Sequence, residues 1–521
     1  MRASTFSFLA VAWAMAVVLP VAAQATGASG FDAPPSVSPV GPGFALGPSR
    51  PTIGGNVLLI LADDVGVDQL RLFAPPAVAF PPRFDTPNID ALAARGVRFA
   101  NAWANPLCSP TRVAIHTGRY AFRTGIGAVM EAGCCGSGCA SRRDCCASCP
   151  DYSLPAGGEL PTRLPGYATA AFGKWHMEDK STATPVDPAA PCSHGYDFFS
   201  GTLWQVPING TPCSTHVASG CAAAEGVNYC DWTRTDIVAS GASGCVPSAV
   251  ATQIYMPAAV IDAARGWLAA QPFGAPVFGL VAPQAPYELG HVPPQRLQDV
   301  LSGAECAVCT PRNRDCYLAA LEALDTKIGE LLAQLGPLWW EHTTVILVGD
   351  NGTPAGVSQT TGYYPAGHAK GSLYDGGVNV PMIVAGRVVE AGQWDTVRTD
   401  LVNVVDLHAT VVEVATGHVP GGVDGESLVG VLQGWSSWTR TYNYAEKFGR
   451  NAAPPGPYAA HERAVRNHRF KLIDFRGRME LYDLWTDPRE TNDLMPKLSR
   501  DEPAFFHYLA LRRVLVGLGR A

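Results

Sequence analysis

Cys108 begins the stretch of this chain whose residue types are best suited to covalent chemistry, Cys108-Ser109-Pro110-Thr111-Arg112. The chain has 15 cysteines, and setting Cys108 aside leaves fourteen, an even number that can pair as disulfides. Cys108 is therefore the candidate for a cysteine with another function. The residues after Pro110 favour a helix, which would place Cys108 at a helix N-terminus, where free N–H groups and the helix dipole favour anions.

Two acidic pairs are candidate metal ligands. Asp63-Asp64 and Asp350-Asn351 each follow an apolar run, and they offer only oxygen ligands. A set of carboxylate and amide oxygens selects Ca²⁺ or Mg²⁺ over zinc. Each pair alone would be an ordinary turn after a strand, so the metal hypothesis depends on the fold bringing the two pairs together.

Three basic groups, Lys174, His176 and Lys370, also fall at strand ends or in loops. A cation surrounded by such groups suits a tetrahedral oxyanion substrate, a sulfate or a phosphate, because the charge that develops in the transition state must be spread over several positive centres. Each residue alone could be a surface lysine or a structural histidine.

The elements that must position these residues are short apolar runs bounded by polar residues. Such runs indicate strands buried on both faces: 56–62, 169–172, 276–282, 343–349 and 380–385. Helices are expected at 86–95, with Thr86 as its cap, and from Leu318 to Leu335, ending at Gly336-Pro337. Alternating strands and helices predict an α/β fold with a large, mostly parallel or mixed sheet between helices, whose carboxyl edge carries the polar groups above.

The C-terminal region, residues 436–521, has a different character. Alternating segments at 463–466, 470–474 and 480–484 predict a small antiparallel sheet, and a helix is expected from Pro503 to Leu518. Residues 53–435 would form the catalytic domain. It includes a cysteine-rich loop at 133–150 and an insertion at 187–250 held by disulfides, and Asn209 in that insertion is a possible glycosylation site.

Residues 1–25 have the charged start, apolar core and small-residue end of a secretory signal peptide, followed by a flexible lead at 26–52. We expect cleavage near Ala25 and a secreted or periplasmic protein without a stable membrane span. Export favours disulfides in the cysteine-rich loop over a zinc site. The formal net charge of −7 argues against a nucleic-acid partner.

The chain resembles the formylglycine-dependent (type I) sulfatases of the alkaline-phosphatase superfamily from about Asn56 to the C-terminal region. The stretch from Cys108 to Arg112, followed by Thr117-Gly118-Arg119, is similar to the Cys-x-Pro-x-Arg signature of that family and its extension. Further blocks resemble the family's in the family's order: Asn56 to Asp64, Gly173 to His176, Asp350 to Gly352, Lys370 to Gly377 and Arg463 to Asp493.

The resemblance implies that Cys108 is oxidised to formylglycine by a formylglycine-generating enzyme, and that one hydroxyl of its gem-diol hydrate attacks the sulfur of a sulfate ester while bound to the cation. Arg112 would hold that group, and His176 would accept a proton as sulfate is expelled. Lys174 and Lys370 would contact the sulfate and the leaving oxygen.

The implied metal ligands are residue 108 together with Asp63, Asp64, Asp350 and Asn351, holding Ca²⁺, with Mg²⁺ as the alternative. The expected substrate is a small-molecule or carbohydrate sulfate ester, as for an arylsulfatase.

One block departs from the family pattern. The chain reads Pro283-Gln284-Ala285-Pro286 where the family usually has a histidine that contacts the sulfate, and a neutral amide supplies neither positive charge nor a proton. His291 and His368 are candidate substitutes. Two alternatives follow: a phosphodiesterase or phosphonate monoester hydrolase on the same scaffold, and a catalytically impaired secreted binding protein.

Overall fold

The computed structural model describes residues 54–130, 154–178, 187–204, 232–240, 244–252, 254–287, 293–297, 299–300, 314–435, 440–452 and 454–518. The predicted signal peptide, the flexible lead, the cysteine-rich loop, His291 and Asn209 lie outside these residues. None of the helices in these ranges combines the length and the apolar character needed to cross a bilayer.

Within the described residues, a sheet of 10 strands runs in the order β10-β2-β9-β8-β1-β7-β3-β4-β5-β6. The strands are β1 (Asn56–Ala62), β2 (Gly96–Trp103), β3 (Ala168–Lys174), β4 (Phe198–Thr202), β5 (Trp232–Ser240), β6 (Gly244–Thr252), β7 (Val277–Ala282), β8 (Thr343–Gly349), β9 (Met382–Gly386) and β10 (Thr396–Asn403). The central strands β8, β1, β7, β3 and β4 are parallel, whereas β9, β5 and β6 pair antiparallel with their neighbours. The sheet is mixed, as expected.

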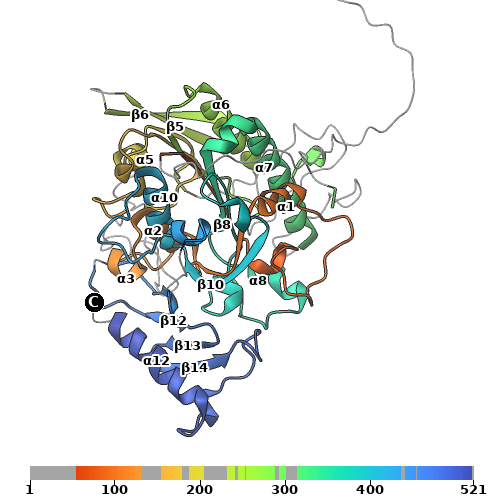
Figure 1. Cartoon of the computed structure of the whole chain (residues 1–521), viewed down its shortest axis with the longest axis vertical. Coiled ribbons are helices and arrows are strands. Elements are labelled where there is room, and N and C mark those ends of the chain that lie inside the picture. Colours follow the sequence, from red (N-terminus) through yellow and green to blue (C-terminus); the bar gives the residue numbers. More distant parts are fainter. Residues whose placement is uncertain are drawn as a thin grey trace, which may run out of the picture. The chain divides into compact units, whose positions relative to one another are not determined.

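Helices cover both faces of the sheet (Figure 1). They are α1 (Pro87–Ala94), α2 (Cys108–Thr117), α3 (Ala121–Thr124), α5 (Ala190–Ser193), α6 (Met256–Ala270), α7 (Arg314–His342), α8 (Ala355–Ser358), α9 (Asp375–Val378), α10 (Asp406–Thr416), α11 (Val429–Leu432) and α12 (Pro503–Leu518). Alternate side chains of β1 point to opposite faces of the sheet and belong to two different hydrophobic cores. Val57 and Leu59 pack with α2 and α10, whereas Leu58 and Ile60 pack with α1, α6 and α7. A strand buried on both faces needs the continuous apolar run that this sequence has.

The expected strands and long helix are confirmed, with small shifts at their ends. Gly336 has φ 56°, a left-handed conformation that interrupts α7 where the Gly336-Pro337 stop was expected. Thr86 stands at the N-cap of α1 but makes no capping hydrogen bond through its side chain. The carboxylate of Asp325 on α7 caps the helix instead, accepting the backbone N–H groups of Asn88 at 3.2 Å and Ile89 at 2.7 Å.

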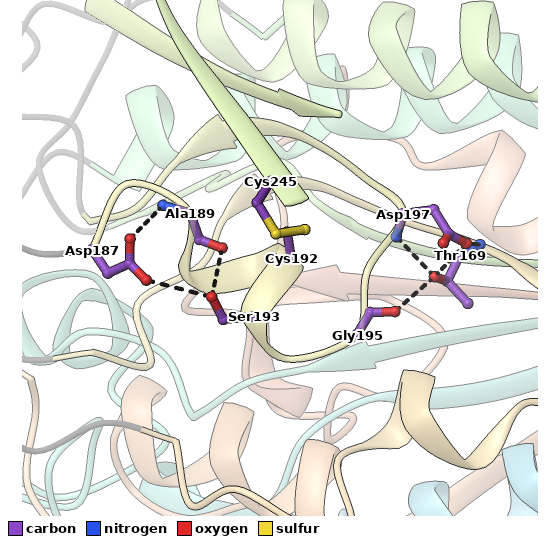
Figure 2. The surroundings of a disulfide bond; sticks show 8 residues. All are labelled: Thr169, Asp187, Ala189, Cys192, Ser193, Gly195, Asp197 and Cys245. Atoms are coloured by element: carbon purple, nitrogen blue, oxygen red, sulfur yellow. Dashed lines mark hydrogen bonds between the residues drawn. A yellow bond between two sulfur atoms is a disulfide. The ribbon is translucent and has the colours of Figure 1, made fainter. Parts of the chain in front are cut away.

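The predicted insertion at 187–250 contains a disulfide, as expected, but its strands were not predicted. Its described residues form α5, β4, β5 and β6, and these strands continue the main sheet. A disulfide joins Cys192 at α5 to Cys245 at β6 (Figure 2). The side chain of Thr169 on β3 bonds to the Gly195 carbonyl and to the Asp197 carboxylate, both at 3.0 Å. These links fix the turn between α5 and β4 against the sheet.

The C-terminal antiparallel sheet and terminal helix are confirmed, and the sheet has a fourth strand that was not predicted. Its order is β11 (Asn443–Lys447), β12 (Glu462–Arg466), β13 (Phe470–Phe475) and β14 (Arg478–Asp483), with α12 packed against β12 and β13 (Figure 1). Trp103 at the end of β2 and Leu373 pack into the core of this sheet. The boundary near residue 436 stays a prediction.

Candidate active site

The carboxyl ends of β1 and β8 bring the two acidic pairs together. The strands are parallel neighbours with Ala62 beside Gly349, so each acidic pair leaves the sheet at the same edge. The Asp64 N–H donates to Asp350 Oδ1 at 3.0 Å. Carboxylate oxygens of Asp63, Asp64 and Asp350 lie within 4.8 Å of one another, and all three residues are fully buried. The proximity expected from the sheet edge is confirmed.

Three cations surround these carboxylates. Arg112, on α2, donates through Nη2 and Nε to Asp350 Oδ2 at 2.8 and 3.2 Å, and through Nη1 to the Lys174 carbonyl at 2.7 Å. Lys174, the last residue of β3, lies 2.8 Å from Asp63 Oδ2 through Nζ. Lys370 Nζ lies 2.7 and 2.8 Å from the two oxygens of Asp64. The side chains of Lys174 and Arg112 are almost wholly buried, so their attraction to the carboxylates is weakly screened.

The electrostatics of the site follow from this packing. Burial alone raises the pKa of Asp63, but the cations around it, Lys174 first, outweigh burial and bring that pKa down to about 2. For Asp64 burial prevails, and with the charges of Asp63 and Asp350 it raises the pKa to about 7 in spite of Lys370. Three carboxylates packed this closely repel one another when all of them are ionised. A cation bound among them would offset that repulsion.

Two buried oxygen atoms indicate where that charge would be bound. Asp63 Oδ1 and Asn351 Oδ1 have no hydrogen-bond partner among the described residues. The Asn351 amide nitrogen donates to Asp64 Oδ1 at 2.8 Å and to the Gly352 carbonyl at 3.0 Å, which leaves its oxygen directed elsewhere. Buried oxygens without a donor are costly, and a hard divalent cation satisfies them. The residues therefore fit a Ca²⁺ or Mg²⁺ ion.

Cys108 is the first residue of α2, and among the described cysteines it alone is a free thiol. Its Sγ lies 3.3 Å from Nδ1 of His176. His176 Nε2 lies 2.9 Å from the Met130 carbonyl oxygen, and because a carbonyl only accepts, Nε2 carries the proton and Nδ1 is left as an acceptor facing residue 108. Burial and the nearby cations lower the pKa of His176 well below its ordinary value, so the ring is neutral. Burial raises the pKa of the Cys108 thiol, which makes the unmodified cysteine a poor nucleophile.

The block containing Gln284 also reaches the site. Gln284 follows β7, is buried, and has φ 53°, a left-handed conformation that costs energy for any residue other than glycine. The Asp63 N–H donates to the Ala285 carbonyl at 3.0 Å, which fixes this block beside the acidic pair. The ring of Tyr287 lies 4.5 Å from Lys174 Nζ and 5.1 Å from Lys370 Nζ. The sequence pattern gave no signal for this tyrosine.

The proposed substitute His368 does not belong to this cluster. Its ring stacks on Tyr374 at 3.5 Å, and Nδ1 lies 3.3 Å from the Arg489 carbonyl, which ties it to the C-terminal region. A second residue that sequence reasoning missed is Tyr317 on α7, whose hydroxyl donates to the Asp64 carbonyl at 2.8 Å. The sequence pattern predicts only that Tyr317 is a core position of an amphipathic helix, because the neighbouring residues do not indicate which loop it faces.

Two protein-family models match this chain. The model of the sulfatase family matches residues 55–418, which is more than half of the chain. The chain belongs to the sulfatase family. A second model, that of the N-sulphoglucosamine sulphohydrolase C-terminal region, matches residues 366–503.

Two relatives and two solved structures illustrate the likeness. Mouse steryl-sulfatase is 26% identical over 445 residues, which cover 73% of this chain and 65% of that protein, slightly less than two thirds of its length. Dog N-acetylgalactosamine-6-sulfatase is 27% identical over 440 residues, covering 82% of this chain and 74% of that protein. Both relatives are named sulfatases, in agreement with the family match.

The structural likenesses show the fold. Ps i-CgsB, solved in complex with a neocarrahexaose, aligns with TM-score 0.62 and 21% identity over 85% of this chain and 89% of that one. The phosphonate monoester hydrolase of Agrobacterium radiobacter aligns with TM-score 0.59 and 20% identity over 89% of this chain and 95% of that one.

Proposed function

We propose that this member of the sulfatase family hydrolyses a sulfate ester at the cluster formed by Cys108, Arg112, Lys174, His176 and Lys370. The observation that carries the proposal is the placement of residue 108, at a buried helix N-terminus, 3.3 Å from a neutral histidine. That arrangement directs a general base at the position of the nucleophile.

Two groups would complete the site. Asp63, Asp64, Asp350 and Asn351, with residue 108, would hold Ca²⁺ or Mg²⁺, which when bound supplies positive charge for the sulfate oxygens. Formylglycine made from Cys108 would supply a hydrated aldehyde, whose hydroxyl would replace as nucleophile a thiol whose pKa burial raises.

The side chains of the chain itself have separable roles. Arg112 orients Asp350 and fixes the β3 end through the Lys174 carbonyl. Lys174 and Lys370 place two ammonium groups where charge develops on the sulfate and on the leaving oxygen. His176 accepts a proton at Nδ1, because its Nε2 proton is held by the Met130 carbonyl.

The charge balance supports an anionic substrate. Three carboxylates face three cationic side chains, so a divalent ion would leave a net positive site. A sulfate ester, which carries one negative charge at neutral pH, would be attracted to it. We take the substrate to be a small-molecule or carbohydrate sulfate ester.

We further propose that the protein is secreted or periplasmic after removal of residues 1–25, with a catalytic domain at 53–435 and a C-terminal subdomain at 436–521.

The test is coexpression with a formylglycine-generating enzyme, followed by mass spectrometry of the peptide that contains residue 108 and rate measurements on 4-nitrophenyl sulfate. We expect an aldehyde at position 108 and turnover that disappears in Cys108→Ala and after treatment with a chelator. A thiol that persists at position 108 despite the modifying enzyme, or turnover that survives Cys108→Ala, contradicts the proposal.

The second candidate is hydrolysis of phosphate diesters or phosphonate monoesters. The structural likeness to a phosphonate monoester hydrolase favours it, as does the neutral Gln284 at a position where a histidine would add positive charge. Rates on nitrophenyl sulfate, bis-nitrophenyl phosphate and nitrophenyl phenylphosphonate separate the two, since a faster phosphorus ester reverses the assignment.

A further inference from the structure

His194 lies between two glutamates beside the segment that carries Lys174 and His176. Its Nδ1 is 2.9 Å from Glu159 Oε1, and its Nε2 is 3.1 Å from Glu178 Oε1. Both glutamates and the histidine are buried, with at most 8% of each residue exposed. A neutral imidazole has one N–H group and can donate to only one of the two carboxylates. Both contacts become hydrogen bonds when the ring carries two protons.

The charges around His194 favour that doubly protonated form. Burial alone lowers the pKa of His194, but the hydrogen bonds to Glu178 and Glu159 outweigh burial and raise it above its ordinary value. Among the described residues, His116 on α2 also interacts electrostatically with His194, and burial lowers the pKa of His116 to about 3, so His116 is neutral and adds no competing charge. Trp175, stacked on the His194 ring at 6.0 Å, is not titratable.

One side of this cluster is rigid. Two residues before His194, Cys192 is joined to β6 by a disulfide, and the following Gly195 carbonyl is bonded to Thr169 of the main sheet (Figure 2). The other carboxylate oxygen of Glu159, Oε2, accepts hydrogen bonds from the backbone N–H groups of Gly157 and Gly158 at 2.9 and 2.8 Å. His194 and Glu159 are therefore fixed points against which another element can be held.

The other side bears the proposed base. His176 has φ 57°, a left-handed conformation that is strained for a residue other than glycine and persists only where its surroundings impose it. On its N-terminal side, Trp175 N–H and His176 N–H bond to the carbonyls of Thr202 and Leu203. On its C-terminal side, Glu178, two residues on, is bonded to His194.

We propose that His194 is a positioning residue whose imidazolium joins Glu159 to Glu178 and so holds the 174–178 segment, with Lys174 and His176, in its reactive conformation. The proposal rests on the proposed function for its kinetic consequences. When pH rises and the ring loses a proton, one nitrogen lone pair faces a carboxylate, and the contact becomes repulsive. This clamp, the pair of hydrogen bonds from His194 to Glu159 and Glu178, is therefore complete below the pKa of His194 and is lost as pH rises through that pKa.

The experiment measures kcat and KM for 4-nitrophenyl sulfate from about pH 5 to about pH 9 in the wild type, His194→Gln and Glu178→Gln. The matched control is His418→Gln, an exposed histidine outside the cluster. In the wild type, kcat should fall as pH rises through the pKa of His194. We expect His194→Gln to lower kcat about tenfold at low pH with KM nearly unchanged, and to abolish this fall at high pH. In Glu178→Gln the fall should occur at lower pH, because one of the two carboxylates that stabilise the imidazolium is gone.

Two measurements on the protein do not need turnover. Exchange of the His194 C2 proton, followed by mass spectrometry, reports the pKa of that ring in the wild type and in Glu178→Gln. Amide hydrogen exchange of the 174–178 segment reports how firmly it is held, and should accelerate in His194→Gln but not in His418→Gln. An ordinary or lowered pKa for His194, or equal exchange in all variants, overturns the proposal. If no sulfate ester is turned over while the exchange results hold, the proposed function fails and the clamp stands.

Discussion

Lys370 and the metal ion are expected to compete for the same carboxylate, and Lys370→Met tests this. Lys370 Nζ lies 2.7 and 2.8 Å from the two oxygens of Asp64. An ion bound by Asp64 would share that carboxylate with the ammonium group, and the two positive charges would repel each other. Asp64 would therefore bind the ion more tightly without the lysine.

The magnitude follows from the charges. Two unit charges about 4 Å apart at an effective dielectric constant of about 20 interact by about 4 kcal/mol. Removing Lys370 leaves the buried Asp64 carboxylate uncompensated, which destabilises the metal-free protein by up to about that amount, and a bound ion recovers part of it. If the bound ion recovers about a third of this lost interaction energy, roughly 1.4 kcal/mol, the Kd for Ca²⁺ falls about tenfold. Turnover should nevertheless fall by about a hundredfold or more, because an ammonium group that stabilises the transition state is lost.

The assay is calorimetric titration of the chelator-treated protein with Ca²⁺, together with thermal unfolding with and without the ion. The control is Lys327→Met, which removes from α7 a lysine that is more deeply buried than Lys370 and pairs with Asp262 at 2.7 Å and Glu330 at 2.5 Å. The control should lose stability without a change in Ca²⁺ affinity. A Kd in Lys370→Met that equals or exceeds that of the wild type refutes the competition.

Three further substitutions have defined outcomes. Tyr287→Leu removes the ring that faces Lys174 and Lys370, and should lower kcat/KM about 3- to 30-fold while Tyr287→Phe keeps most activity; equal rates for both variants would show that the ring contributes nothing. Asp325→Ala leaves the N-terminal N–H groups of α1 without their acceptor, and denaturant unfolding should show a loss of about 3 kcal/mol with KM for the sulfate ester unchanged. Gln284→His restores a group that can carry charge and should raise turnover of an aryl sulfate; unchanged turnover excludes Gln284 as a limit on activity.

The sequence by itself determined the centre of the fold. The run from Asn56 to Ala62 is apolar at every position but the first, and its length and β-branched residues favour a strand buried on both faces, so β1 and the acidic pair after it were predictable. The same reasoning placed Asp350 at the same sheet edge, because parallel neighbours end together. The odd cysteine count and the helix start singled out Cys108, and that placement is confirmed.

Other strands depended on pairing between distant segments. The edge strand β10 carries charged and polar residues at several positions and has no clear pattern, yet it pairs parallel with β2, about three hundred residues earlier in the chain. The strands β4, β5 and β6 were not predicted for the same reason, since these segments become strands through pairing with the neighbouring strand and not through local propensity. Backbone hydrogen bonds to a partner can stabilise a segment that has little β-preference of its own.

The partners of each charged group were also decided only by tertiary structure. Sequence named Lys174 and Lys370 as basic residues of the site, but only the folded chain assigns Lys174 to Asp63 and Lys370 to Asp64. Tyr287 and His194 had no detectable signal, because an aromatic ring beneath two ammonium groups and an imidazole between two glutamates are contacts between loops. Composition and periodicity describe the elements of the sheet, whereas the geometry of loops at its edge arises from packing among segments far apart in the chain.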